Sequence, residues 1–235
     1  TDHINMVGQT QKSTHAMLQA KFFELAKMLN SIPVSSSSDA HICPGARFAD
    51  MPAYTDWSHE GLDYCIQNGI MSGTSATTIA PNGVTTRAQI VQILYNLEGE
   101  PETSGWYPFV DLKQDWYVNA VRWAYTKGVV SGTSATTFDP DLPVTREQIA
   151  VILMGYADQI LKLEHTWTPA DLSSYPDAGS VSGWAKDALA DAVALGLISG
   201  ASNGGQTYLD PQGGASREQV ATILMEFCKN VMNKQ

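Results

Sequence analysis

The stretch Thr86-Arg87-Ala88-Gln89 recurs as Thr145-Arg146-Glu147-Gln148 and as Ser216-Arg217-Glu218-Gln219. A Ser or Thr followed three positions later by Gln is a capping box, so a helix is predicted to begin at each arginine. A helix N-terminus carries the positive end of the helix dipole, where an anion is favourable and a cation is not. Three such arginines indicate a repeated anion-binding device built from a helix N-terminus and a guanidinium. They predict an acidic ligand, bound in several similar pockets.

Each arginine motif closes one copy of a unit that the chain contains three times. In every copy the tryptophan precedes the first glycine by 12 residues, the first glycine precedes the second by 4, and the proline precedes the arginine by 6. The matched residues are Phe48, Asp50, Trp57, Gly69, Gly73, Pro81 and Arg87; Phe109, Asp111, Trp116, Gly128, Gly132, Pro140 and Arg146; and Tyr175, Asp177, Trp184, Gly196, Gly200, Pro211 and Arg217. We therefore divide the chain into an N-terminal segment, 1–40, and repeats at 41–102, 103–164 and 165–235.

Two amphipathic patterns in each repeat predict a helix, a glycine-rich loop and a second helix. After each tryptophan, small residues at +4 and +8 would let helices approach closely, and Gly69, Gly128 and Gly196 would end these helices. After each arginine, apolar residues follow the i, i+3, i+4, i+7 spacing, as in Ile90, Ile93, Leu94 and Leu97. One helix pair cannot bury its own apolar face, but three pairs packed together can, so the fold class is all-α.

Residues 1–40 lie outside the repeats. The pattern from His15 to Ile32 predicts an additional amphipathic helix, and Ser35 to Ser38 resembles a flexible link. This helix would dock on the repeats, end a preceding domain, or mediate self-association.

The composition limits the classes of partner. A formal charge of -10 argues against nucleic acid and anionic lipid surfaces. No run of 18 apolar residues exists, so membrane insertion is not expected. The N-terminus lacks the pattern of a secretory signal, so an exported form would be a processed or excised piece. Cys43, Cys65 and Cys228 show no metal-ligand spacing; Cys65 fits a small core position, and a Cys43–Cys228 disulfide is disfavoured. No metal or cofactor is expected, and the histidines are interpreted as surface residues.

The repeated unit resembles the S-layer homology (SLH) repeat in its Phe-x-Asp, Trp, Gly-Ile/Val/Leu-x-Ser-Gly, Pro and Thr-Arg-x-Gln elements. This resemblance covers about residues 45–230 and implies three repeats in a pseudo-threefold helical assembly with ligand grooves between neighbours. Proteins with three such repeats are typically held non-covalently to the bacterial cell wall, which implies an extracellular, cell-surface location. Their usual ligand is a secondary cell-wall polysaccharide whose N-acetylmannosamine carries a pyruvate ketal.

The resemblance implies that Arg87, Arg146 and Arg217 meet the ketal carboxylate. Further groove residues implied in this way are Trp57, Trp116 and Trp184 with the glycines Gly73, Gly132 and Gly200. Hydroxyl groups of Thr74 and Thr133 would bond sugar oxygens, whereas Ala201 cannot. The third loop, 199–207, is also longer, so the third groove is expected to be altered or empty. The motif's fourth residue, often glutamate in the family, is glutamine in all three copies here.

Other interpretations remain open at this stage. The arginines would be structural if they formed salt bridges with Asp50, Asp111 and Asp177, although these acids better fit a role in organising loops. The tryptophans would be either core residues or groove walls. A protein-protein assembly module of a surface layer is therefore the alternative to a non-catalytic, glycan-binding anchor. A glycan-cleaving enzyme is disfavoured, because no acid/base pair follows from the spacing.

Overall fold

The computed structural model describes residues 43–232, so the predicted helix at His15–Ile32 lies outside the described residues. Its α-helices are α2 (His59–Gln67), α3 (Arg87–Leu97), α4 (Asp115–Thr126), α5 (Arg146–Tyr156), α6 (Lys186–Ala194) and α7 (Arg217–Asn230). Short helical turns are η1 (Pro44–Arg47), η2 (Ala157–Leu161), η3 (Leu172–Ser174) and η4 (Ala178–Ser180). The predicted all-α class is confirmed. Among residues 43–232, no helix has both the length and the apolar character needed to cross a bilayer.

The glycines predicted to end the first helix of each repeat do so. Gly69, Gly128 and Gly196 follow α2, α4 and α6 with φ values of 67°, 76° and 73°. This left-handed conformation has no steric cost for glycine and terminates a helix by turning the chain away.

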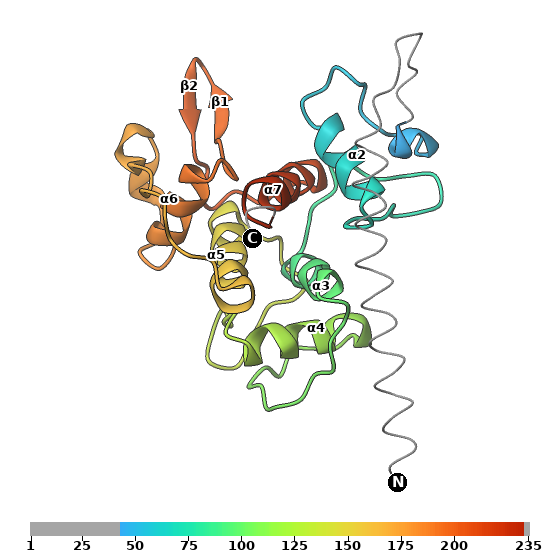
Figure 1. Cartoon of the computed structure of the whole chain (residues 1–235), viewed down its shortest axis with the longest axis vertical. Coiled ribbons are helices and arrows are strands. Elements are labelled where there is room, and N and C mark those ends of the chain that lie inside the picture. The colour runs from blue at the N-terminus through green and yellow to red at the C-terminus, as the bar shows by residue number, and fades with distance from the viewer. Residues whose placement is uncertain (1–42, 233–235) are drawn as a thin grey trace. The chain divides into compact units, whose positions relative to one another are not determined.

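The first helix of each repeat packs against the second helix of another repeat. α4 packs on α3, α6 packs on α5, and α2 packs on α7. The last pair joins the first repeat to the third and closes the arrangement into a ring (Figure 1). Small residues allow this approach as predicted, since a Cβ on Gly61 would lie only 2.8 Å from the Thr222 Cα atom. The helix-loop-helix units are thus confirmed, but each buries its apolar faces against its neighbours.

A closed triangle of backbone hydrogen bonds links the strand-like segments that lead into α3, α5 and α7. Thr85 N–H donates to Ala215 O at 3.1 Å, Ala215 N–H to Val144 O at 3.0 Å, and Val144 N–H to Thr85 O at 2.9 Å. These three helices lie toward the middle of the three repeats, and α2, α4 and α6 lie outside them (Figure 1). The pseudo-threefold arrangement follows from this repeated bonding.

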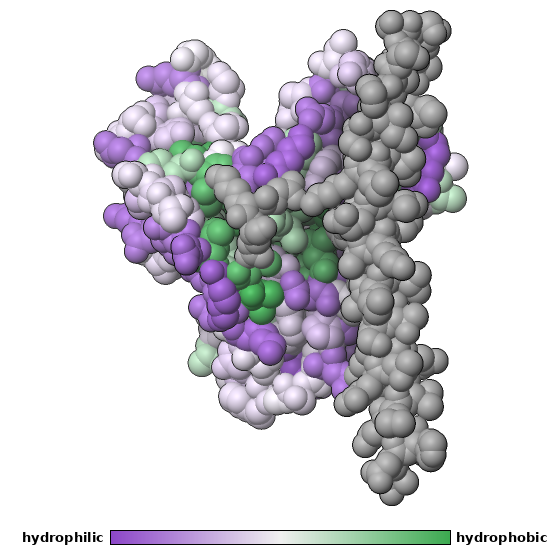
Figure 2. Space-filling view, in the orientation of Figure 1, coloured by the Kyte–Doolittle hydropathy of each residue, from purple (hydrophilic) through white to green (hydrophobic). Residues whose placement is uncertain are grey.

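The core runs between the central helices. The apolar stripes after the arginines are buried, and they include Ile90, Leu94, Ile149, Leu153, Val220 and Leu224. On the face in Figure 2, hydrophobic surface is concentrated in the middle, over α5 and toward α3, and hydrophilic residues lie around it. Cys65 is buried as predicted, and Cys43, Cys65 and Cys228 are free thiols.

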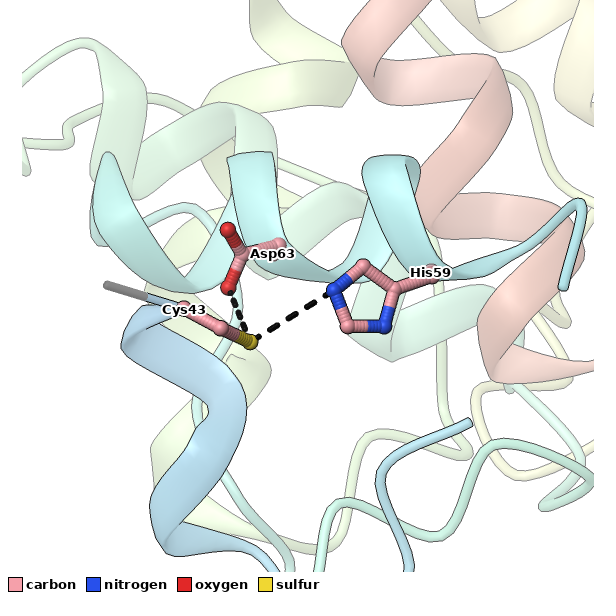
Figure 3. A group of neighbouring side chains, drawn as sticks. All are labelled: Cys43, His59 and Asp63. Atoms are coloured by element: carbon pink, nitrogen blue, oxygen red, sulfur yellow. Dashed lines mark hydrogen bonds between the residues drawn. The ribbon is translucent and has the colours of Figure 1, made fainter. Parts of the chain in front are cut away.

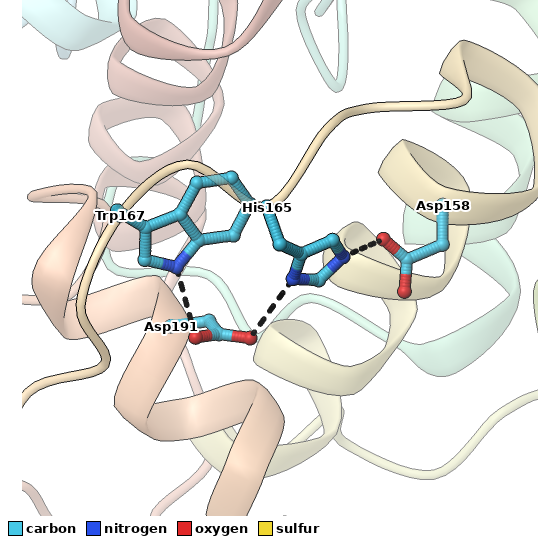
Figure 4. A network of polar contacts seen from close by, with 4 residues as sticks. All are labelled: Asp158, His165, Trp167 and Asp191. Atoms are coloured by element: carbon cyan, nitrogen blue, oxygen red, sulfur yellow. Dashed lines mark hydrogen bonds and ion pairs between the residues drawn. The ribbon is translucent and has the colours of Figure 1, made fainter.

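Two features distinguish the third repeat. Its longer loop forms an antiparallel hairpin of β1 (Ala201–Asn203) and β2 (Gln206–Tyr208), turned by Gly204 and Gly205 at positive φ. The start of the repeat is held by His165, whose Nε2 lies 2.8 Å from Asp158 Oδ1 and whose ring stacks on Trp167 (Figure 4). Trp167 in turn donates to Asp191 on α6 at 2.9 Å.

Candidate functional site

All three predicted capping boxes form. The side chains of Thr86, Thr145 and Ser216 accept a hydrogen bond from the backbone amide of the glutamine three positions later. Each glutamine side chain in turn accepts from the amide of its capping residue, as Gln89 Oε1 does from Thr86 N–H at 3.0 Å. The arginines therefore occupy the first position of α3, α5 and α7, where the sequence placed them.

The next amides at these helix starts are already bonded within the protein. Arg87 N–H donates to Leu142 O and Ala88 N–H to Pro140 O, both at 3.0 Å. The starts of α5 and α7 make the same pair of bonds to the following repeat in the ring. The prediction that free helix amides form part of an anion site is therefore wrong. The guanidinium remains as the candidate.

Each guanidinium reaches backbone carbonyls of the next repeat in the ring. Arg87 Nε–H donates to Phe138 O at 2.9 Å, and Arg87 Nη2 donates to Ser131 O at 3.3 Å. Arg217 repeats both bonds, with Ile79 O at 2.8 Å and Ser72 O at 2.7 Å. Arg146 donates through Nε to Leu209 O at 2.8 Å. The arginines thus help to hold neighbouring repeats together.

The three arginines are partly or fully withdrawn from solvent. Arg87 and Arg146 are 5% and 7% exposed, and Arg217 is half-buried. Burial lowers the pKa of Arg87, and the charges of Asp139 and Asp111 partly oppose that effect. In the part of the chain that the structure describes, no arginine among the three forms an ion pair within 4.0 Å. The sequence-level alternative of direct salt bridges to Asp50, Asp111 and Asp177 is therefore wrong.

These aspartates organise the loops instead, as the sequence favoured. Asp50 accepts from the amides of Ile79 and Ala80, both at 2.8 Å, and the Ile79 bond is the main cause that lowers the pKa of Asp50. Asp111 and Asp177 hold the matching amides of their own repeats. The second amide of each pair belongs to a residue at positive φ, namely Ala80, Asp139 and Asp210. The carboxylates thereby fix the loops whose carbonyls the arginines contact.

An open cleft of about 600 Å³ lies beside Arg87. We name it the Arg87 cleft; it is lined by Arg87, Gly128, Val129, Val130, Ser131, Gly132, Thr133, Gln148, Val151, Ile152, Gly155 and Trp184. Four of the predicted site residues therefore meet here, contributed by all three repeats. The sequence does not reveal the wall formed by α5, because Ile152 follows the i, i+3, i+4, i+7 spacing expected of core residues and Val151 carries no signal. Gly155 is required there, since a Cβ would lie 2.7 Å from Val129 O.

The tryptophans belong to the surface rather than to the core. Trp57, Trp116 and Trp184 are 60%, 47% and 60% exposed. Trp184 lines the Arg87 cleft. Trp57 and Trp116 take the matching places in their own repeats, and their contact with a ligand stays a prediction.

The loop residues have structural roles. Gly73 and Gly132 approach the rings of Phe48 and Phe109 and leave no space for a Cβ, and Gly200 has a φ of 81°. Thr74 and Thr133 are exposed. The Thr74 hydroxyl donates to Thr78 O at 3.3 Å, whereas the Thr133 hydroxyl lies 3.2 Å from Thr137 O and donates to the Asp139 carboxylate at 2.5 Å. In the third repeat the β1–β2 hairpin replaces this loop, and the altered or empty third groove stays a prediction.

The chain is similar to a known family of repeats. A family model described as the S-layer homology domain matches residues 47–91, 108–150 and 174–221, which agrees with the three repeats found by self-alignment.

Curated relatives match the chain over a small part of their own length. An endoglucanase of Bacillus sp. (strain KSM-635) is 33% identical over 72% of this chain and 17% of the relative. A surface-layer 125 kDa protein of Lysinibacillus sphaericus is 30% identical over 83% of this chain and 16% of the relative. The S-layer protein sap of Bacillus anthracis is 24% identical over 66% and 18%. The chain thus spans about a sixth of the length of these relatives.

Proposed function

The chain belongs to the S-layer homology family, a family of the bacterial cell surface, and from this premise we propose that it anchors a protein to the cell wall by binding an anionic, pyruvylated secondary cell-wall polysaccharide. The ligand would occupy the grooves between repeats, with its ketal carboxylate near an arginine. The observation that carries this proposal is the Arg87 cleft, where a buried guanidinium that forms no ion pair with any residue of 43–232 lies beside an open space and an exposed tryptophan.

The electrostatics favour a carboxylate in that cleft. A guanidinium removed from water loses hydration, and two carbonyl bonds replace only part of it. An incoming carboxylate would interact with it at short range in a medium of lower dielectric constant than water. The net charge of -10 repels an anion at long range, but physiological salt screens this repulsion over about 8–10 Å.

The size and lining of the cleft suit a sugar residue or a short glycan. A volume of about 600 Å³ lies within the range of about 300–1,000 Å³ usual for small-molecule sites. Val151 and Ile152 give an apolar wall, and Arg87, Gln148 and Thr133 add polar groups. Such a mixture of apolar surface and few polar groups is typical of ligand sites.

The relatives support a module that is separate from any catalytic part. The relatives that match this region are named as an endoglucanase and two surface-layer proteins, and each match covers less than a fifth of the relative. A segment that recurs in proteins with such different names is more consistent with attachment than with one reaction. We therefore propose a non-catalytic role for this chain.

Calorimetry with the full chain tests the proposal. We expect heat of binding with pyruvylated N-acetylmannosamine and none with the same sugar lacking the ketal. The Trp184→Ala variant should bind the ligand with lower affinity. Trp106→Ala is the control and should keep the affinity, because Trp106 is 75% exposed and does not line the Arg87 cleft. Absence of heat at millimolar sugar, or equal heat with and without the ketal, would contradict the proposal.

The alternative is a protein-protein assembly module with structural arginines, and the arginine bonds to neighbouring repeats favour it. Sedimentation with purified wall fragments would separate the two. A variant with alanine at positions 87, 146 and 217 that keeps its circular dichroism and still binds walls supports assembly. Loss of wall binding with an intact fold supports the anchor.

A further inference from the structure

Cys43, His59 and Asp63 come together at the beginning of the first repeat (Figure 3). His59 and Asp63 are four residues apart and share one face of α2, while Cys43 directly precedes η1. The Cys43 Sγ atom lies 3.5 Å from His59 Nε2 and 3.0 Å from Asp63 Oδ1. One sulfur, one imidazole nitrogen and one carboxylate oxygen therefore face a common point.

The surrounding contacts fix these groups in orientations that suit a metal ion. His59 Nδ1 lies 2.8 Å from Pro52 O, so this nitrogen carries the proton and donates it. The Nε2 lone pair is then directed toward the sulfur. Gly45 N–H donates to Asp63 Oδ1 at 2.9 Å and holds the carboxylate in place. Metal sites use the same supporting bonds to orient their histidine and carboxylate ligands.

The cluster is not part of the repeated fold. The positions of His59 in the other repeats hold Val118 and Lys186, and those of Asp63 hold Arg122 and Ala190. Both other repeats form their first helix without these polar groups. His59 and Asp63 are nevertheless 7% and 6% exposed, so the interpretation of His59 as a surface residue is wrong.

We propose that Cys43, His59 and Asp63 bind one zinc ion. Zinc bonds of about 2.3 Å to sulfur and about 2.0 Å to nitrogen, at a tetrahedral angle, place the two ligand atoms about 3.5 Å apart. The observed sulfur-to-nitrogen distance is 3.5 Å. The sulfur-to-oxygen distance of 3.0 Å must lengthen by about half an ångström, because the thiol now donates a hydrogen bond to that oxygen.

Zinc binding replaces that hydrogen bond. The Cys43 proton leaves to solvent, the thiolate, carboxylate and imidazole coordinate the ion, and a water molecule takes the fourth position. A sulfur, nitrogen and oxygen set suits zinc better than magnesium or calcium, which prefer oxygen alone. The bound ion would tie η1 to α2, the helix that closes the ring by packing on α7.

The test uses the full chain, stripped of metal with a chelator and dialysed against zinc. Elemental analysis should find about one zinc ion per chain, and X-ray absorption should show one sulfur ligand at about 2.3 Å. Zinc should also raise the melting temperature, because an ion bound only by the folded chain stabilises it.

Two variants and one control locate the ion. Cys43→Ser and Asp63→Asn should each lower zinc affinity by at least about tenfold and abolish the zinc-dependent rise in melting temperature. Cys228→Ala, which removes a thiol outside the cluster, should keep both. A zinc content at background in the unaltered chain would overturn the proposal and leave a hydrogen-bonded cluster. Unchanged affinity in Cys43→Ser would also overturn it, since the ion would then bind elsewhere.

Discussion

Arg87 and Arg217 make the same pair of bonds in different electrostatic surroundings. Both donate through Nη2 to the first carbonyl of a loop whose seven residues are identical, 72–78 and 131–137, and through Nε to the carbonyl of the residue that follows that loop. Arg87 is 5% exposed, and its guanidinium lies 4.6 Å from the centre of the Phe138 ring. Arg217 is half-buried, with Ile79 at the place of Phe138. Identical loops therefore do not produce identical sites.

The residue that follows Phe138 or Ile79 determines how much negative charge surrounds each arginine. Among residues 43–232, the charges of Asp139 and Asp111 act on Arg87, whereas the charge of Asp50 acts on Arg217, where Ala80 occupies the position of Asp139. Asp139 also accepts from the Thr133 hydroxyl, and Thr74 has no such carboxylate at position 80. We name Arg217, Ser72, Thr74 and Ile79 the Arg217 site, and we expect it to attract an anion more strongly than the Arg87 cleft.

The largest expected difference concerns stability. Arg87→Ala should lower the free energy of unfolding by about 2–4 kcal/mol, because two carbonyls in a buried setting lose their donor. Arg217→Ala should cost only about 1–2 kcal/mol, since water reaches the half-buried site. Urea unfolding of both variants provides the measurement. Equal losses would show that exposure does not distinguish the two arginines.

A second prediction concerns ligand affinity. Ala80→Asp would place a carboxylate near Arg217, as in the second repeat, and should weaken binding of the pyruvylated sugar about 3-fold to 10-fold. Aspartate tolerates the positive φ of 51° at this position, so the fold should persist. Ala80→Asn is the neutral control and should leave affinity unchanged. Calorimetry at low and high salt should show the difference shrinking as salt screens the charge.

The aspartate that fixes the first loop gives a prediction for pH. The folded-state pKa of Asp50 is below its unfolded value, so its ionised form contributes stability above about pH 4. That contribution is lost as the pH falls toward the folded-state pKa. Asp50→Asn should therefore remove part of the fall in the urea midpoint between about pH 5 and pH 2. An unchanged pH profile in this variant would show that the Ile79 and Ala80 bonds do not stabilise the ionised carboxylate.

The smallest expected effect concerns the loop hydroxyls. Thr74→Val should weaken sugar binding about 2-fold to 3-fold, the effect of one modest hydrogen bond. Thr133→Val should change affinity less, because Asp139 already engages that hydroxyl. Parallel titrations of the two variants compare them directly. A larger loss in Thr133→Val would reverse the proposed ranking of the two sites.

The sequence predicted the local features well because they depend on neighbouring residues. The capping boxes of Thr86, Thr145 and Ser216 and the terminal glycines formed as expected. Contacts between repeats were not predictable, since they depend on how the ring closes. The bond from Arg87 to Phe138 spans 51 residues, and that from Arg217 to Ile79 spans 138. In the closed ring, the helix amides that were predicted to bind the ligand donate to carbonyls of the neighbouring repeat instead.

The chemistry of the Cys43 cluster was also hidden from the sequence. Cys43 and His59 are 16 residues apart, and no spacing rule connects them. Only the packing of η1 on α2 brings the thiol to the helix face that carries His59 and Asp63.

The most direct measurement of the central claim is a titration of the full chain with pyruvylated N-acetylmannosamine, followed by the same titration after removal of the ketal. We predict saturable heat only with the ketal present, and a lower affinity as salt increases. Equal binding of both sugars, or no binding of either, would contradict the assignment of a carboxylate to the guanidinium groups of Arg87, Arg146 and Arg217.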